Sequence, residues 1–215
     1  MGKIMEAIFC IIYLILTSVL GITIVARSKG DKEHKLFGIM SLILVFGDSF
    51  HLVPRIISAF DKTSDLSFAL GMGKLVTSVT MTIFYLLMFM VFSIRYKFKN
   101  QVMLIVMCLL TLVRIGLCMF PQNNWVEGSD GLWGIYRNIP FLIMGIIMVV
   151  LYFMKRKDAP YKFMWLAITL SFLFYIPVVL WSDVHKMIGM LMMPKTCMYV
   201  WIVMMGLLDQ KKSAR

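Results

Sequence analysis

Five basic residues lie inside long apolar stretches of the sequence, where a charged side chain is rarely tolerated. They are Arg55, Lys74, Arg114, Arg137 and Lys195. An ionisable group in hydrocarbon is costly unless it faces a polar cavity or an oppositely charged partner. Position along each stretch places all five toward the same side of the membrane. We therefore expect them to build a pocket for a negatively charged ligand.

Too few acidic residues are expected nearby to neutralise these five basic residues. Only Asp48 and Asp183 are predicted at a similar depth. Asp48 lies ~18 Å along its helix from Leu36, at 1.5 Å per residue, which is near the membrane midplane. Asp183 falls at the outer mouth of the bundle. A structural ion pair of Asp48 with Arg55 or Lys195 is the alternative to a chemical role.

Spacing places the polar residues on shared helix faces. Asp48, His51 and Arg55 are separated by three and then four residues, so they follow one face of a helix. Two further stripes have helical spacing: Lys74, Ser78, Thr82 and Tyr85, and then Thr111, Arg114 and Cys118. Stripes at overlapping depth on separate helices favour one common cavity. Ser78 and Tyr85 thereby become candidate ligand-binding residues, although Arg137 could instead snorkel toward the interface.

The elements that must position these residues are transmembrane helices. Hydrophobic residues make up 60% of the chain and charged residues 15%, a balance that excludes an ordinary soluble domain. A helix needs ~20 apolar residues to cross a bilayer. The sequence predicts an all-α, polytopic membrane protein, a seven-helix bundle forming a single domain over residues 1–215. The expected spans lie near 4–26, 36–60, 66–94, 102–120, 132–154, 163–180 and 187–208.

The loops carry a consistent charge asymmetry that predicts orientation. Basic residues gather in alternate loops and the tail: Arg27, Lys29, Lys32 and Lys35, then Arg95, Lys97 and Lys99, then Lys155, Arg156, Lys157 and Lys162, and finally Lys211, Lys212 and Arg215. The other side has only Lys3, Lys62 and Lys186. Because basic loops stay in the cytoplasm, we expect the N-terminus outside and the C-terminus cytoplasmic in a cell membrane. This topology explains the net charge of +11, so no nucleic-acid partner is expected.

The remaining residues give little sign of a bound metal or cofactor. The cysteines lie inside spans without paired spacing, and we read them as packing residues and expect no metal and no cofactor: Cys10, Cys108, Cys118 and Cys197. The polar loop over residues 121–131 could cap a pocket, but we favour a plain turn.

Two segments resemble the lysoplasmalogenase family of membrane proteins. The first is GDSFHLVPR (Gly47–Arg55), and the second is FALGMGKLVTSVTMTIFYLL (Phe68–Leu87). The family pattern, a Gly-Asp pair followed by Leu and often Pro-Arg and then a Phe-x-x-Gly helix ending in Tyr, is matched there. Ser182-Asp183 and Tyr199 match the C-terminal part of the pattern. The chain departs from the family in having one N-terminal helix fewer and no His before the tyrosine.

The resemblance implies hydrolysis of the vinyl ether bond of a lysophospholipid, with membrane lipid as the partner. Protonation of the vinyl carbon creates an oxocarbenium ion that water attacks. In this hypothesis Asp48 donates the proton, Asp183 stays ionised, and His51 orients Asp48 or shares its proton. The surplus arginines and lysines bind the phosphate.

Other functions fit the same residues. A transporter or receptor-like binder of a small anion or lipid would use the same basic cavity, although transport would require polar groups in the cytoplasmic half as well. A zinc hydrolase could use His51, His185 and Asp183 as a minimal ligand set. A retinal protein is disfavoured because Lys195 follows a proline and lacks an acid one turn before it. Lipid or partner binding without chemistry also stays open.

Overall fold

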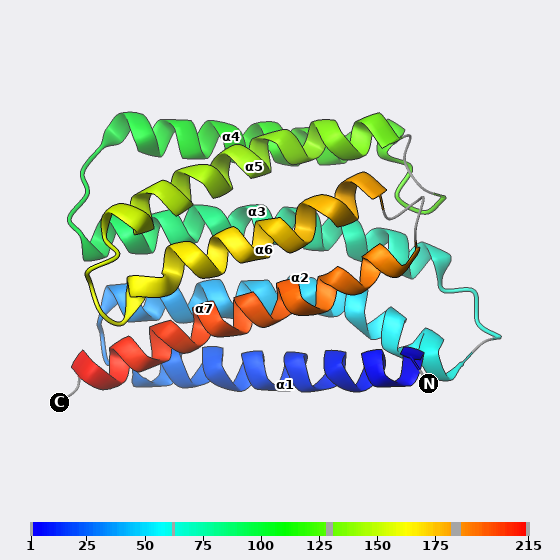
Figure 1. Cartoon of the computed structure of the whole chain (residues 1–215), viewed down its shortest axis with the longest axis horizontal. Helices are drawn as coiled ribbons and strands as arrows, with labels where there is room; N and C mark the ends of the chain where they lie inside the picture. Colours follow the sequence, from blue (N-terminus) through cyan, green and yellow to red (C-terminus); the bar gives the residue numbers. More distant parts are fainter. Residues whose placement is uncertain (1, 62, 128–130, 182–185, 214–215) are drawn as a thin grey trace.

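The chain forms a bundle of long helices that run side by side along the longest axis of the molecule (Figure 1). The structure is a computed structural model, and it describes residues 2–61, 63–127, 131–181 and 186–213. Within these residues there are helices and turns but no strand. The α-helices are α1 (Gly2–Arg27), α2 (Lys32–Phe60), α3 (Ser67–Arg95), α4 (Gln101–Met119), α5 (Gly131–Met154), α6 (Met164–Trp181) and α7 (Met192–Ser213). Short 3-10 segments are η1 (Pro121–Asn123), η2 (Tyr161–Phe163) and η3 (Lys186–Leu191).

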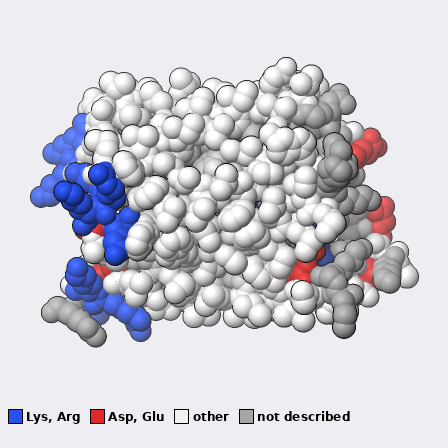
Figure 2. Space-filling model, viewed as in Figure 1, with Lys and Arg blue, Asp and Glu red and all other residues white. Residues whose placement is uncertain are grey.

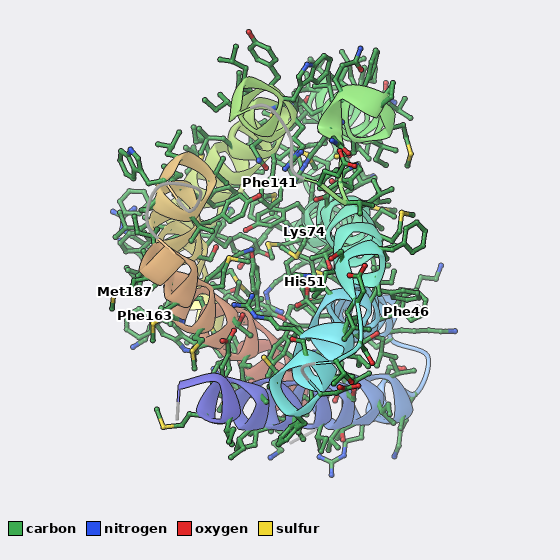
Figure 3. The ribbon with its side chains drawn as sticks, turned by 90° about the vertical axis from the view of Figure 1, so that its right-hand side faces the viewer. Phe46, His51, Lys74, Phe141, Phe163 and Met187 are labelled. Atoms are coloured by element: carbon green, nitrogen blue, oxygen red, sulfur yellow. The ribbon has the colours of Figure 1, made fainter. Side chains whose placement is uncertain are left out.

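Consecutive helices are antiparallel neighbours, and the last helix closes the bundle. Each helix contacts the next along the chain, and α7 also packs against α1 and α2. The helices therefore form a ring that can enclose a central space, as the end-on view in Figure 3 shows. The termini lie at opposite ends of the bundle (Figure 1). We call the end that holds the N-terminus the N-terminal end, and the opposite end the basic end.

Seven helices of the described residues are long and apolar enough to cross a membrane. The predicted all-α class is therefore confirmed, and the seven apolar helices are consistent with the predicted multi-pass bundle. Their bounds differ from the predicted spans because several helices continue into polar residues. For example, α2 begins at Lys32 rather than at 36, and α7 reaches Ser213 rather than 208. The seventh span also opens with η3, so its α-helix begins only at Met192.

Charge separates the two ends of the bundle. On the face drawn in Figure 2, lysines and arginines gather at the basic end with a few acids among them, other acids lie at the N-terminal end, and a broad uncharged band lies between the two ends. Such a band is the surface that hydrocarbon requires. The distribution agrees with the loop pattern in the sequence, while the assignment of the basic end to the cytoplasm stays a prediction.

An aromatic layer fills the centre of the bundle. The ring of Tyr85 on α3 makes edge contacts with Phe84, Phe141 and Phe172, and Phe84 meets Tyr199 on α7. All five rings are buried. These ring contacts hold α3, α5, α6 and α7 together.

Charged residues close the basic end. Arg95 at the end of α3 donates to Glu33 at 2.8 Å, to Asp209 at 2.7 Å and to Asp158 at 2.9 Å. His34 bridges Asp209 at 3.1 Å. We call these residues, with Asp31, the Arg95 cluster. It joins α2, α3, α7 and the segment after α5.

Asp31, a member of the Arg95 cluster, lies just before α2. Asp31 caps α2 by accepting a hydrogen bond from the Glu33 N–H at 2.9 Å, and it also contacts His34. Burial by itself would raise the pKa of the Asp31 carboxyl, but the hydrogen bonds from His34 and Glu33 lower it overall. Asp31 is therefore ionised at neutral pH, and its negative charge stabilises a positive charge on the neighbouring His34 side chain.

Candidate functional site

A cavity of about 630 Å³ opens in the N-terminal half of the bundle. Its lining comes from every helix except α1 and from the loop between α4 and α5. The charged and imidazole side chains in the lining are His51, Arg55, Lys74, Arg114, Glu127, Arg137 and Lys195. In Figure 3 the labelled His51, Lys74 and Phe141 point into the central space, while Phe46 points away from it. The predicted convergence of the five basic residues on one cavity is confirmed.

Helix α2 contributes two of these residues through its spacing. His51 and Arg55 are one turn apart, so they share the face that lines the cavity. Asp48, one turn earlier, is not part of the lining. Its carboxylate instead accepts a hydrogen bond from the Tyr13 hydroxyl of α1 at 2.6 Å.

Two glycines let α3 bring Lys74 to the cavity. A Cβ added to Gly73 would clash with the backbone carbonyl of Phe50 on α2. A Cβ added to Gly71 would lie 2.5 Å from the carbonyl oxygen of Trp125. Only glycine permits this close approach. The GMGK sequence thus places α3 between α2 and the α4–α5 loop, with Lys74 at an exposed rim of the cavity.

Arg114 on α4 is the most deeply buried basic residue of the cavity, with 2% of its surface exposed. Its guanidinium stacks 3.5 Å above the ring of Phe141, and Nη2 lies 3.4 Å from the Asn138 side-chain oxygen. The thiol of Cys118 is beside it. Within the described residues, Nε and Nη1 have no hydrogen-bond acceptor and no carboxylate makes an ion pair with Arg114.

Such an environment is costly for a guanidinium, which cannot lose its charge in a protein. A buried donor without a partner costs about 1–3 kcal/mol. An anion in the cavity would supply both the missing acceptors and the missing charge. Arg114 therefore has the features of a ligand-binding residue rather than of a packing residue.

The loop after α4 caps the cavity. Arg137 donates to the Asn123 side-chain oxygen at 2.7 Å and lies 4.1 Å above the ring of Trp125. Asn123 and Trp125 in turn donate to the last carbonyls of α4. Asn123, Asn124, Trp125 and Glu127 all line the cavity. The expectation of a plain turn at this loop was wrong, because its side chains donate hydrogen bonds to the last carbonyls of α4 and line the cavity. Residues 128–130 of the loop lie outside the described residues.

The acids at this end are more numerous than the sequence suggested. Glu6 on α1 forms an ion pair with Arg55, with Nε and Oε1 2.5 Å apart. Glu127 joins the lining from the loop. The expectation that only Asp48 and Asp183 lie near the basic residues was therefore wrong. Depth along a helix could not reveal that α1 packs beside α2 and brings Glu6 to Arg55.

The alternative of a structural ion pair between Asp48 and Arg55 or Lys195 does not hold for the described residues, in which Asp48 has no salt bridge. Arg55 pairs with Glu6 instead. Lys195 is 6% exposed and lies 4.2 Å above the ring of Tyr175, and only longer-range Coulomb attraction links it to Asp48. Lys195 thus lines the cavity with its ammonium group over an aromatic ring.

A second cavity of about 330 Å³ adjoins the first. Both are lined by His51, Arg55 and Lys74, and the second reaches α1 at Glu6 and Cys10. The Glu6–Arg55 ion pair lies where the two meet. The side chains of His51, Arg55 and Lys74 thus face both cavities.

The other predicted site residues divide into three cases. Ser78 lines the main cavity, and its hydroxyl donates to the Lys74 carbonyl at 2.8 Å. Tyr85 is absent from the lining and is fully buried in the aromatic layer. Asp183 and His185 lie outside the described residues. The placement of Tyr85 gives it a packing role beneath the cavity, whereas the roles assigned to His51, Asp48 and Asp183 stay predictions.

The sequence analysis missed the Arg95 cluster. The predicted span over 36–60 left His34 in the preceding loop, but it lies in the first turn of α2 and is 4% exposed. Glu33, His34 and Asp209 are close enough together to hold a metal ion. Arg95 already supplies the positive charge there, because it donates to both Glu33 and Asp209. The spacing of Asp31 and His34 was the available signal, but the partners on α3 and α7 are far away in the sequence.

No protein-family model, curated protein or solved structure matches this chain.

Proposed function

We propose that the protein is a membrane-embedded hydrolase that binds the phosphate of a single-chain lipid in the main cavity and cleaves its vinyl ether bond. Arg114 carries the proposal. A permanently charged guanidinium, buried with two unpaired nitrogens and directed at a cavity, is explained by an anionic ligand. The resemblance to lysoplasmalogenases supports the choice of lipid and of reaction.

The charge balance of the cavity suits a phosphate. Arg114 and Lys195 have no acidic partner within salt-bridge distance among the described residues, and both are buried. Guanidinium groups bind phosphate oxygens through paired N–H donors, and a lysine adds a compact positive charge. A phosphate between Arg114 and Lys195 would satisfy the orphan donors and reduce the repulsion between the two cations.

The proposed reaction needs a proton donor close to the lipid. Asp48 supplies a proton through His51 to the vinyl carbon, and the ether carbon becomes an oxocarbenium ion. Water adds to that carbon and returns a proton to a carboxylate, which we assign to Asp183. The resulting hemiacetal gives its hydroxyl proton back to the Asp48 side and takes the proton of Asp183 on its leaving oxygen, so it separates into a fatty aldehyde and the free hydroxyl of the glycerophospho headgroup while both carboxyl groups regain their starting states. No oxidant or metal is required.

His51 could connect Asp48 to the cavity. It follows Asp48 by three residues on α2, so the two side chains share one side of the helix. His51 lines the cavity, and its Nδ1 has no hydrogen-bond partner among the described residues. An imidazole in that position can accept a proton from one group and deliver it to another. We assign it the proton relay between Asp48 and the lipid.

The test is an assay of purified protein with a lysoplasmalogen and with the acyl lysophospholipid of matched headgroup. We expect fatty aldehyde from the first and no fatty acid from the second. Asp48→Asn should abolish aldehyde formation, Arg114→Gln should raise KM, and the control Arg156→Gln at the basic end should leave both unchanged. Full aldehyde formation by Asp48→Asn would rule out the proposed chemistry.

A second candidate is a carrier of small anions, which the two ends of the molecule favour. The cavity opens at the N-terminal end, while the Arg95 cluster closes the basic end, the asymmetry expected of an alternating-access protein in one state. Uptake of labelled glycerol 3-phosphate into proteoliposomes, without aldehyde formation, would support the carrier over the hydrolase.

A further inference from the structure

A narrow apolar groove runs between α5 and α6. Its volume is about 100 Å³. The groove is lined by Ile135, Asn138, Ile139, Phe141 and Leu142 from α5 and by Phe172, Tyr175, Ile176, Val179 and Leu180 from α6. Apart from Asn138 and Tyr175, every lining side chain is a hydrocarbon or an aromatic ring.

The groove adjoins the basic cavity. Asn138, Phe141, Tyr175 and Val179 line both spaces. Tyr175 donates to the Asn138 side-chain oxygen at 2.8 Å, and Arg114 approaches that same oxygen at 3.4 Å. The boundary between polar and apolar surroundings therefore runs through Asn138 and Tyr175, directly beside Arg114.

The outer side of the groove faces the uncharged band of the molecule. Ile139 is 47% exposed and Ile176 is 38% exposed. These side chains lie where bilayer hydrocarbon would touch the protein. The groove thus has lipid on one side and the basic cavity on the other.

This geometry answers a physical difficulty. Moving a hydrocarbon chain from the bilayer into a polar, water-filled chamber lowers the binding constant about fourfold for each methylene. A long-chain lipid cannot enter the cavity whole without that penalty. A lateral opening removes the penalty, because the headgroup enters while the chain stays in apolar surroundings.

We propose that the groove between α5 and α6 seats the hydrocarbon chain of a single-chain anionic lipid whose phosphate lies against Arg114 and Lys195. This inference rests on the proposed phosphate site and adds the binding site of the lipid's hydrocarbon chain. The stretch from Phe172 to Leu180 covers ~12 Å along α6, so the groove holds the first part of the chain and the bilayer holds the rest. The link between headgroup and chain then lies beside Asn138 and Tyr175.

The test uses a long-chain lysophospholipid with a photoreactive diazirine in the chain close to the headgroup. The probe is bound to the full-length protein in detergent, irradiated, and mapped by mass spectrometry. We expect adducts on Ile139, Ile176 or their neighbours in the groove. Adducts confined to other helices, or no adducts, overturn the proposal.

A blocked groove gives a second readout. The double variant Ile139→Trp, Ile176→Trp should lower adduct yield about fifteenfold, which corresponds to loss of the contact of roughly two methylenes. The control is Leu173→Trp, since Leu173 lies on α6 with 61% exposure but outside the groove. The control should keep the wild-type yield. An unchanged yield in the double variant contradicts the groove as the seat of the chain.

The result is separable from the fate of the proposed function. Binding of glycerol 3-phosphate, which has no chain, should be unaffected by the double variant and lost in Arg114→Gln. Adducts in the groove without aldehyde formation would retain the seat and refute the hydrolase. Aldehyde formation with adducts elsewhere would retain the hydrolase and refute the seat.

Discussion

Two arginines buried in this bundle should respond in opposite ways to replacement by methionine. Arg114 has two nitrogens without acceptors and no acidic partner in the described part of the chain. Arg95 makes ion pairs with Glu33, Asp158 and Asp209. If Arg114 serves a ligand, Arg114→Met should stabilise the ligand-free protein, whereas Arg95→Met should destabilise it.

The magnitudes follow from the contacts. Two unpaired donors cost roughly 2–6 kcal/mol if they are dry, and water in the cavity reduces that cost. Loss of the contact with the Phe141 ring costs about 0.5–2 kcal/mol. Replacement of Arg114 should therefore raise the free energy of unfolding by about 1–3 kcal/mol. Replacement of Arg95 leaves acids without their partner and should lower it by about 3–5 kcal/mol.

Thermal unfolding in detergent, followed by intrinsic fluorescence, measures both effects. For a chain of this size, 1 kcal/mol corresponds to roughly 2–4 °C in Tm. A phosphate-bearing lysolipid at 100 times its Kd should stabilise the wild type by about 2.7 kcal/mol. It should leave the Tm of Arg114→Met unchanged. A destabilised Arg114→Met protein with a normal response to ligand would refute the argument and make Arg114 a structural residue.

Three further substitutions test the neighbourhood of the cavity. Glu6→Gln releases Arg55 from its partly exposed ion pair, so the affinity for phosphate, measured by titration, should rise about fivefold at low salt and less at high salt. A lower affinity than that of the wild type would contradict this. Gly73→Ala should lower the free energy of unfolding by about 1–3 kcal/mol in a denaturation assay, because its methyl meets the α2 backbone, and a neutral result would mean that α3 lies further away. Tyr13→Phe removes the hydrogen bond to Asp48 and should lower kcat about tenfold and move its pH profile, with KM unchanged; a change in KM alone would count against a positioning role.

The sequence allowed the helices and much of the cavity to be predicted. Hydropathy located the spans because a bilayer demands ~20 apolar residues from each. Helical periodicity placed His51 and Arg55 on one face and turned Arg114 inward together with Cys118. These features depend only on local geometry, which repeats along every helix.

What the sequence could not give depends on which helices are neighbours. The Glu6–Arg55 pair requires α1 beside α2, and the Arg95–Asp209 pair joins residues from α3 and α7. The inward position of the Asn123 side chain depends on its hydrogen bonds to carbonyls at the end of α4, which have no partner within the helix. Depth along a helix is set by its rise per residue, but lateral order is set by side-chain packing over the whole bundle. The charge that could neutralise a given arginine was therefore not predictable.

The Arg95 cluster has a mechanical consequence. One guanidinium holds three acids from different parts of the chain, so α2, α3 and α7 cannot separate at that end without breaking several charge contacts together. The helices are therefore held together at the basic end, and any separation between them is largest at the N-terminal end. If the protein is the proposed hydrolase, the glycerophospho product therefore leaves at the N-terminal end, and the fatty aldehyde returns to the membrane leaflet from which the lipid entered.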